Sequence, residues 1–230
     1  MYNNIKVIAF DADDTLWVNE TYFREAEHQF AKLLANYETE NKIDQELFKK
    51  EIENLHYYGY GIKGFVLSMV ECALEISNYQ ISQKKIEQIV NIGKEMLEKP
   101  IELLPDIKQV LESLQNNYKL IVATKGDLLD QERKLEKSGL LKYFHHIEVM
   151  SDKQPKDYLK LIQHLDIHPN ELLMIGNSLK SDVLPLIEVG SSAIHIPFHT
   201  TWVHEEVTEE EKSTTNYKTV LNIKEVLTLF

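Results

Sequence analysis

Hydrophobic positions along the chain form two kinds of pattern. Five short apolar runs predict strands, and three of these runs are near-continuous, as in parallel strands that are buried on both faces. The runs are Lys6–Phe10, Lys119–Ala123, His146–Met150, Leu172–Ile175 and Ser192–Ile196. Apolar residues at helical spacing between them predict helices around Ile107–Leu114, Leu128–Ser138 and Tyr158–Leu165. Strands that alternate with helices indicate an α/β fold with a doubly wound, Rossmann-like parallel sheet.

One interval breaks this alternation. From about Val18 to Leu97 the apolar residues have helical spacing, and no run predicts a strand. A helical block of this length, inserted after the first strand, fits a separate domain. We therefore expect an α/β core of residues 1–17 and 97–230 and an inserted all-helical cap domain of residues 18–96. Inside the cap, the glycine- and tyrosine-rich segment His56–Gly64 (HYYGYGIKG) predicts a loop.

Composition narrows the classes of partner. The chain has 230 residues, and its net charge of -12 argues against nucleic acid and membrane as partners, because both attract basic surfaces. No apolar run approaches the roughly 20 residues of a membrane span, and the N-terminus carries no signal-peptide pattern. Cys72 is the single cysteine, so no intrachain disulfide is possible, and its apolar surroundings predict a core residue. We expect a cytoplasmic protein, as a monomer or a homodimer.

Three aspartates crowd the end of the first predicted strand, in Asp11-Ala12-Asp13-Asp14. Ligands of open α/β sheets bind outside the carboxyl ends of the strands. If the backbone stays extended, Asp11 and Asp13 project to one side, and their carboxylates repel each other unless a cation lies between them. The spacing suits a Mg²⁺ site, a nucleophile beside a general acid, or a capping or turn role. Asp14 is expected to turn away and make local hydrogen bonds.

Other predicted strands also end in polar groups. The second is followed by Thr124-Lys125-Gly126, whose hydroxyl and backbone N–H groups can hold phosphate oxygens. The fourth ends in Gly176–Asp182 (GNSLKSD), which adds oxygen ligands, and Lys153 and Lys156 precede a helix. Carboxylates, a hydroxyl, an amide and a lysine at successive strand ends form a plausible constellation for phosphoryl transfer.

Together these motifs resemble those of the haloacid dehalogenase superfamily of hydrolases, in the subclass with a helical cap after the first motif. The DxDxT motif matches Asp11–Thr15, the second motif matches Thr124, the third is a lysine before a helix, and the fourth matches Gly176–Asp182. The resemblance covers nearly the whole chain. It implies a Mg²⁺-dependent phosphatase that hydrolyses a monoester of a small phosphorylated metabolite.

The resemblance also implies a role for each matching residue. Asp11 would attack phosphorus and form an aspartyl-phosphate. Asp13 would protonate the leaving oxygen and then activate water, and its backbone carbonyl would bind Mg²⁺. Thr124 and Lys153 would neutralise the phosphoryl oxygens. The implied metal ligands are Asp11, Asp13, Asn177 and Asp182, and the expected substrate-binding residues are Thr15, Lys63, Lys125, Gly126 and Asn177.

Two positions depart from the family pattern. Asn177 stands where an acidic residue is usual, so Asp182 is expected to be the charged metal ligand. The third motif, commonly Lys-Pro, reads Lys153-Gln154-Pro155-Lys156. Lys153 is preferred as the motif lysine because it better preserves the expected distance along the chain to Gly176, and Lys156 is expected in the first turn of the helix.

Three other functions stay open. A 2-haloacid dehalogenase also uses an aspartate nucleophile but no metal, and such enzymes generally lack the second aspartate, so Asp13 favours a phosphatase. A phosphomutase would need a substrate that returns its phosphoryl group to the enzyme. A non-catalytic regulatory protein that binds a phosphate ligand is disfavoured by the intact motifs at Asp11, Asp13, Thr15 and Thr124.

The sequence also predicts the structure of several further segments. Tyr57–Lys63 is predicted either to close over the site, with Lys63 near a polar group of the substrate, or to pack between cap and core. His199–Glu206 (HTTWVHEE) lacks a dependable metal-ligand spacing and is expected to be a loop near the active-site edge. The acidic run Glu205–Glu211 is expected on the solvated surface, and Val220–Leu229 is predicted to form a final strand and helix.

Overall fold

The chain divides into two compact units. The computed structural model describes residues 2, 4–214 and 217–230, with the backbone alone at residues 213 and 214. The first of the two units, which we call the α/β unit, contains residues 1–20, 101–125 and 131–230. The second, which we call the helical unit, contains residues 21–100 and 126–130. The domains expected from the sequence divide after residues 17 and 96, and the expected cap did not include residues 126–130.

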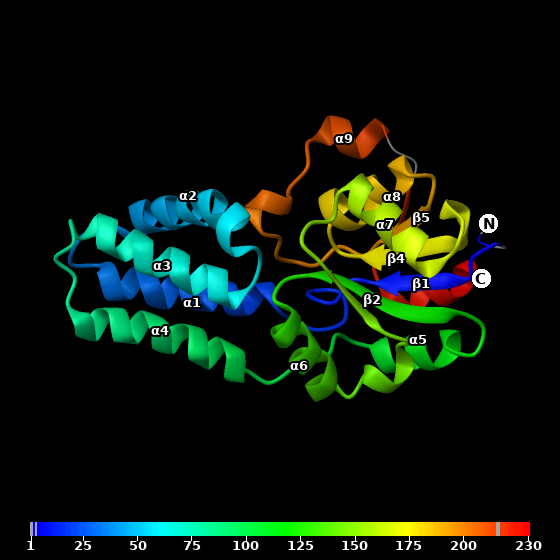
Figure 1. Cartoon of the computed structure of the whole chain (residues 1–230), viewed down its shortest axis with the longest axis horizontal. Helices are drawn as coiled ribbons and strands as arrows, with labels where there is room; N and C mark the ends of the chain where they lie inside the picture. Colours follow the sequence, from blue (N-terminus) through cyan, green and yellow to red (C-terminus); the bar gives the residue numbers. More distant parts are fainter. Residues whose placement is uncertain (1, 3, 215–216) are drawn as a thin grey trace. The chain divides into compact units, whose positions relative to one another are not determined.

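A parallel sheet of six strands forms the centre of the α/β unit, in the order β3-β2-β1-β4-β5-β6 (Figure 1). Every neighbouring pair is parallel. The chain runs outward from β1 through β2 to β3 and then crosses to β4, so the order of the strands switches beside β1, where such sheets bind ligands. The predicted doubly wound, Rossmann-like fold is confirmed. The strands are β1 (Val7–Phe10), β2 (Lys119–Lys125), β3 (Ile147–Met150), β4 (Leu172–Gly176), β5 (Ser192–His195) and β6 (Lys218–Thr219).

Alternate residues of each central strand enter two different cores. Ile8 and Phe10 of β1 pack in one core with residues of α5 and α6, whereas Val7 and Ala9 pack in the other with residues of α7 and α8. The helices therefore lie on both faces of the sheet, as Figure 1 shows. The α-helices of this part of the chain are α5 (Ile107–Leu114), α6 (Leu128–Ser138), α7 (Pro155–Leu165), α8 (Leu184–Glu188) and α9 (Glu209–Thr214). Shorter turns are η1 (Leu141–Tyr143), η2 (Pro169–Glu171), the π-helical η3 (Leu179–Val183), η4 (Val203–Glu205) and η5 (Ile223–Leu229).

The prediction for the last apolar segment is wrong in its details. The final strand, β6, precedes Val220, and Ile223–Leu229 forms the 3-10 helix η5 and not an α-helix. Ile223 and Val226 are the buried residues of η5. Their spacing of three residues matches the three residues per turn of a 3-10 helix, which brings both side chains onto the core.

Four helices make up the helical unit. They are α1 (Glu20–Leu34), α2 (Glu40–Tyr58), α3 (Ile62–Ile76) and α4 (Gln83–Glu98). Each contributes apolar side chains to one shared core, among them Phe30, Leu47, Met69 and Ile89. Cys72 lies in this core, as expected, and burial together with nearby carboxylates raises the pKa of its thiol to about 12. Cys72 therefore stays a neutral thiol that serves packing.

The predicted loop His56–Gly64 is mostly helical. α2 continues through Tyr58 and α3 begins at Ile62, so the connection is reduced to Gly59–Gly61. Gly59 and Gly61 have φ values of 68° and 110°, a backbone region that other residues rarely adopt, which explains glycine at both places. The prediction failed because three glycines and three tyrosines were interpreted as one loop, although only two of the glycines bend the chain.

None of the helices in residues 2, 4–214 and 217–230 is both long enough and apolar enough to cross a membrane.

The sheet core leads to a prediction about stability. Leu173 of β4 is fully buried in the core that contains α5, whereas Leu221 is 82% exposed. Leu173→Ala should lower the free energy of unfolding by about 2–5 kcal/mol, because a buried cavity replaces the lost side chain. Leu221→Ala should change that free energy by less than about 0.5 kcal/mol. Urea unfolding followed by circular dichroism measures both variants, and a similar loss in both would contradict the assignment of this core.

Candidate active site

Asp11 lies at the carboxyl edge of the sheet, directly after β1. Phe10 pairs with Val122 of β2 on one side and with Ile175 of β4 on the other. The backbone N–H of Asp11 continues this ladder and donates to the carbonyl of Ile175 at 2.9 Å. The residue is 7% exposed. The sheet thus fixes the backbone of Asp11 beside the point where the strand order switches.

Lys153 joins Asp11 to a second buried carboxylate. Its Nζ lies 2.5 Å from Asp11 Oδ1 and 2.6 Å from Asp182 Oδ1. The side chains of Lys153 and Asp182 are both 1% exposed. Lys153 comes from the segment between β3 and α7, whereas Lys156 is exposed in the first turn of α7. Of the two candidate lysines, the structure brings Lys153 to the aspartates.

The charges of this cluster do not balance. Burial raises the pKa of the Asp11 carboxyl, Lys153 opposes that rise, and the negative charges of Asp182 and Asp13 add to it. Burial alone would lower the pKa of Lys153, but Asp11 and Asp182 raise it well above its ordinary value, so the ammonium stays charged. Two carboxylates that share one ammonium leave an excess of negative charge in a largely buried site.

The loop Gly176–Asp182 holds Asp182 in place. A Cβ atom on Gly176 would overlap the carboxylate of Asp182, so only glycine fits at the end of β4. Asp182 Oδ2 accepts a hydrogen bond from the backbone N–H of Ser178 at 3.0 Å, and Ser178 Oγ accepts one from the N–H of Ser181, also at 3.0 Å. Tyr158 Oη donates to the carbonyl of Ser181 at 2.8 Å. The carboxylate is therefore oriented from several sides before any ligand binds.

Thr15 links the first motif to this loop. Its hydroxyl lies 3.4 Å from Asp11 Oδ2 and 3.3 Å from the side-chain oxygen of Asn177. Asn177 is thereby brought to the same cluster as Asp11. Thr124, in β2, is 1% exposed, and its hydroxyl donates to the carbonyl of Lys125 at 3.1 Å. The hydroxyl of Thr124 thus bonds to the backbone carbonyl of the next residue in this arrangement.

Asp13 has its own set of partners. Its carboxylate accepts hydrogen bonds from Trp17 Nε1 at 2.7 Å, Gln131 Nε2 at 2.8 Å and Lys134 Nζ at 2.6 Å. Gln131 and Lys134 lie three residues apart on α6, so they share one face of that helix. All three partners are donors, and together they fix the orientation of the Asp13 side chain.

The backbone after Asp11 does not stay extended, which corrects the reasoning about Asp14. Asp14 has a φ of 61°, and the N–H of Leu16 bonds to the carbonyl of Ala12 at 2.8 Å, so the chain turns here. The carboxylate of Asp14 accepts from the N–H groups of Asn19 and Glu20, the kind of local bonding that was expected. Burial raises the pKa of Asp14 to about 7.

Two of the expected substrate-binding residues, Lys63 and Gly126, belong to the helical unit. Lys63 Nζ lies 2.9 Å from Asp127 Oδ1 in that unit. Gly126 has a φ of 125°, which again suits glycine. A third, Lys125, belongs to the α/β unit, and its Nζ contacts Glu205 at 2.5 Å and Ser181 Oγ at 2.9 Å. The structure therefore joins Lys125 to the Gly176–Asp182 loop.

Sequence reasoning missed three residues of this region. Gln131 and Lys134 lie inside a helix without any motif, and their spacing of three residues is the single signal that could have grouped them. Glu205 was assigned to a solvated acidic run, but its side chain is only 13% exposed and contacts Ser178, Ser181 and Lys125. The run is polar because most of it is on the surface, and its first residue points inward.

The predicted metal ligands are all hard oxygen donors. Among the residues that the structure describes, no group of three or more histidine, cysteine, aspartate and glutamate side chains is arranged to hold a metal ion. The expected set differs, because it combines the carboxylates of Asp11 and Asp182 with the amide oxygen of Asn177 and a backbone carbonyl. Mg²⁺ prefers such oxygen ligands. The donor chemistry and the excess of negative charge around Lys153 therefore fit a divalent cation.

The comparisons with known proteins identify the family. The model of the haloacid dehalogenase-like hydrolases matches residues 5–190. The chain belongs to the haloacid dehalogenase-like hydrolases, as the motifs predicted. A haloacid dehalogenase-like family hydrolase from Xanthomonas campestris is 36% identical, with a TM-score of 0.81, over 91% of this chain and 88% of that chain.

Two curated relatives are phosphatases. The chain is 24% identical to the N-acylneuraminate-9-phosphatase of Homo sapiens, over 88% of this chain and 84% of the relative. It is 21% identical to the glyceraldehyde 3-phosphate phosphatase of Methanopyrus kandleri, over 84% of each chain. In both comparisons the matched region covers at least 84% of this chain and of the relative.

The shared ammonium leads to a prediction about pH. Lys153→Met should destabilise the metal-free protein by about 3–5 kcal/mol, because two buried carboxylates lose their cation. The folded variant then holds carboxyl protons more tightly than the unfolded chain, so its stability rises as the pH falls towards the ordinary carboxyl pKa of about 4. The deficit relative to wild type should be larger at about pH 8 than at about pH 5. Urea unfolding in the presence of a chelator measures it.

Lys156→Met is the matched control. Lys156 is exposed in α7, so its replacement should leave stability nearly unchanged at both pH values. A Lys153→Met deficit that is the same at both pH values would contradict the idea that the ammonium offsets the two carboxylates.

Proposed function

We propose that this hydrolase is a Mg²⁺-dependent phosphatase that acts on a monoester of a small phosphorylated metabolite through an aspartyl-phosphate on Asp11. One observation carries the proposal: Lys153 holds the carboxylates of Asp11 and Asp182 together at the carboxyl edge of the sheet. A nucleophilic carboxylate, a fixed cation and further oxygen donors are what phosphoryl transfer requires. The phosphatases among the relatives support the same class of reaction.

The first chemical step belongs to Asp11. Its carboxylate oxygen attacks phosphorus while the bond between phosphorus and the leaving oxygen breaks. Asp13 enters this step as the carboxylic acid and gives its proton to that leaving oxygen, for which one of its hydrogen-bond donors must first give way. The charge on the phosphoryl oxygens is neutralised by Lys153, with Thr124 as a hydrogen-bond donor once its hydroxyl turns from the carbonyl of Lys125.

The second step frees the enzyme. Asp13, again a carboxylate, takes a proton from a water molecule, whose oxygen attacks the phosphorus of the aspartyl-phosphate. Phosphate leaves and the carboxylate of Asp11 is restored. Trp17 and Lys134 hold the Asp13 side chain in place through hydrogen bonds to its Oδ1. A Mg²⁺ ion on Asp11, Asp182, Asn177 and the carbonyl of Asp13 would offset the repulsion between the anionic phosphoryl group and the anionic nucleophile.

The helical unit is proposed to act as a cap that selects the substrate. Tyr57 is 73% exposed at the end of α2, and the Lys63 side chain is 58% exposed in α3. Exposed aromatic and cationic side chains of this kind suit a polar, anionic metabolite. The two curated phosphatase relatives carry the names of chemically different substrates, so the proposal names the class of phosphate monoesters and not a single compound.

The proposed nucleophile is tested by substitution. Asp11→Asn should lower the rate of p-nitrophenyl phosphate hydrolysis in Mg²⁺ by at least about a thousandfold, because the amide cannot form the covalent intermediate. Melting temperatures of both proteins show whether the variant is folded. A colorimetric assay for p-nitrophenolate measures the rate.

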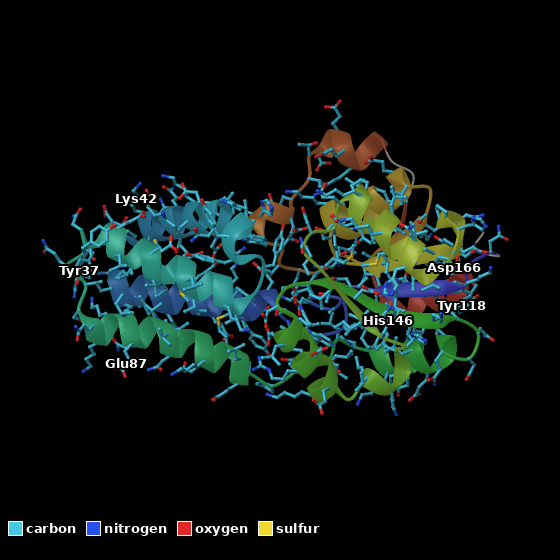
Figure 2. All side chains as sticks on the ribbon, in the orientation of Figure 1. Tyr37, Lys42, Glu87, Tyr118, His146 and Asp166 are labelled. Carbon is cyan, nitrogen blue, oxygen red and sulfur yellow. The ribbon has the colours of Figure 1, made fainter. Side chains whose placement is uncertain are left out.

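Asp166→Asn is the matched control, because Asp166 is exposed (Figure 2) and follows the last residue of α7, whereas Lys153 precedes the first residue of that helix. It should retain the wild-type rate, and Asn tolerates the left-handed backbone found there. Wild-type protein without turnover, or an Asp11→Asn variant at the wild-type rate, would overturn the proposal. Release of halide from a 2-haloacid without Mg²⁺ would support a dehalogenase instead.

A further inference from the structure

The segment that follows β5 returns to the loop Gly176–Asp182. Its 3-10 turn η4 (Val203–Glu205) ends in Glu205, whose carboxylate contacts two serines of that loop. Glu205 Oε2 accepts hydrogen bonds from Ser178 Oγ and Ser181 Oγ, each at 2.5 Å. Its other oxygen, Oε1, lies 2.5 Å from Lys125 Nζ at the end of β2. One carboxylate thus joins three segments that are far apart in the sequence.

Each of the two serines is adjacent in sequence to one of the proposed metal ligands. Ser178 follows Asn177 directly, and Ser181 precedes Asp182 directly. The backbone N–H of Ser178 also bonds to Asp182 Oδ2, so a shift of Ser178 would move the carboxylate of Asp182. Glu205 therefore reaches the ligands through one intervening residue on each side.

The charge state of Glu205 supports a strong contact. Burial alone would raise the pKa of this carboxyl, but Lys125 and the two serine hydroxyls outweigh burial and bring the pKa down to about 2. Hydrogen bonds from hydroxyl groups to an ionised carboxylate are stronger than those between neutral groups. The side chains of Lys125 and Glu205 are 14% and 13% exposed, so the pair is largely shielded from solvent.

We propose that Glu205 is a positioning residue: it holds Ser178 and Ser181 so that Asn177 and Asp182 present their oxygens to the metal. Lys125 acts as the counter-ion of Glu205, which assigns its ammonium to the loop and not to the substrate phosphate. This inference rests on the proposed function, because it concerns the same metal site. It adds a residue outside the motifs on which that proposal was built.

The test measures metal binding without turnover. Isothermal titration calorimetry with MgCl₂ compares wild type, Glu205→Gln and Glu206→Gln in the absence of substrate. Removal of a residue that supports a metal ligand typically weakens metal binding by about 10–100-fold, and Glu205→Gln should do so. Glu206 is the adjacent exposed glutamate, and Glu206→Gln removes the same charge without the serine contacts, so it should bind Mg²⁺ as wild type does.

A kinetic measurement separates positioning from a direct catalytic role. The Mg²⁺ concentration that gives half-maximal p-nitrophenyl phosphate hydrolysis should rise in Glu205→Gln by the same factor as the dissociation constant. At saturating Mg²⁺ the rate should recover most of its wild-type value, because Glu205 does not touch the reacting atoms. Glu205→Asp keeps the charge and should restore part of the affinity.

A folding check and a second variant keep the result interpretable if Glu205→Gln does not fold. Melting temperatures without metal show whether Glu205→Gln is folded. If it is not, the double variant Ser178→Ala, Ser181→Ala removes the two hydroxyl contacts while leaving Glu205 paired with Lys125, and it should weaken Mg²⁺ binding in the same way. Wild-type affinity in a folded Glu205→Gln protein, or in the serine variant, would overturn the inference.

The inference and the proposed function fail in different measurements. Wild-type protein that binds no Mg²⁺ would overturn the inference, whatever the phosphatase assay gives. Wild-type protein that binds Mg²⁺ through a Glu205-dependent loop but hydrolyses no phosphate ester would support the inference and contradict the proposed function.

Discussion

The ammonium of Lys153 between two buried carboxylates is the interaction on which the site depends. Asp11 and Asp182 follow neighbouring strands of a parallel sheet, so the fold itself brings their negative charges together. Buried like charges of this kind are unfavourable unless a cation lies between them. Lys153, from the segment after β3, supplies one positive charge for two negative ones. The remaining imbalance is what makes the cluster suited to a divalent cation.

The surrounding polar groups follow the same principle. Two further carboxylates at this edge of the sheet each have their own lysine, Lys134 for Asp13 and Lys125 for Glu205. A chain with a net charge of -12 therefore concentrates three shielded lysines where its chemistry is proposed to occur. Because the pairs involve different lysines, the proposed nucleophile Asp11, the proposed acid/base Asp13 and the loop that carries Asp182 are each held separately.

The sequence predicted the sheet and the motif residues because local signals mark them. Continuous apolar runs identified β1, β2 and β4, and the polar residues after those strands could meet at one edge in a parallel sheet. The contacts of Glu205 and Lys134 could not be predicted in this way. Lys134 is 121 residues from Asp13 along the chain, and Glu205 is 27 residues from Ser178, so no local pattern records either contact. The prediction of a loop at His56–Gly64 was wrong for another reason. Most of this segment continues α2 or begins α3, although its glycine and tyrosine content is typical of a loop.

The most direct test of the central claim is chemical trapping of the intermediate. Enzyme quenched in acid during turnover, then reduced with borohydride, converts an aspartyl-phosphate into homoserine, which peptide mass spectrometry can locate. The proposed reaction at Asp11 predicts homoserine at position 11 and at no other aspartate. Homoserine at position 13 or 182, or its absence during steady turnover, would contradict a site in which Lys153 holds Asp11 as the nucleophile.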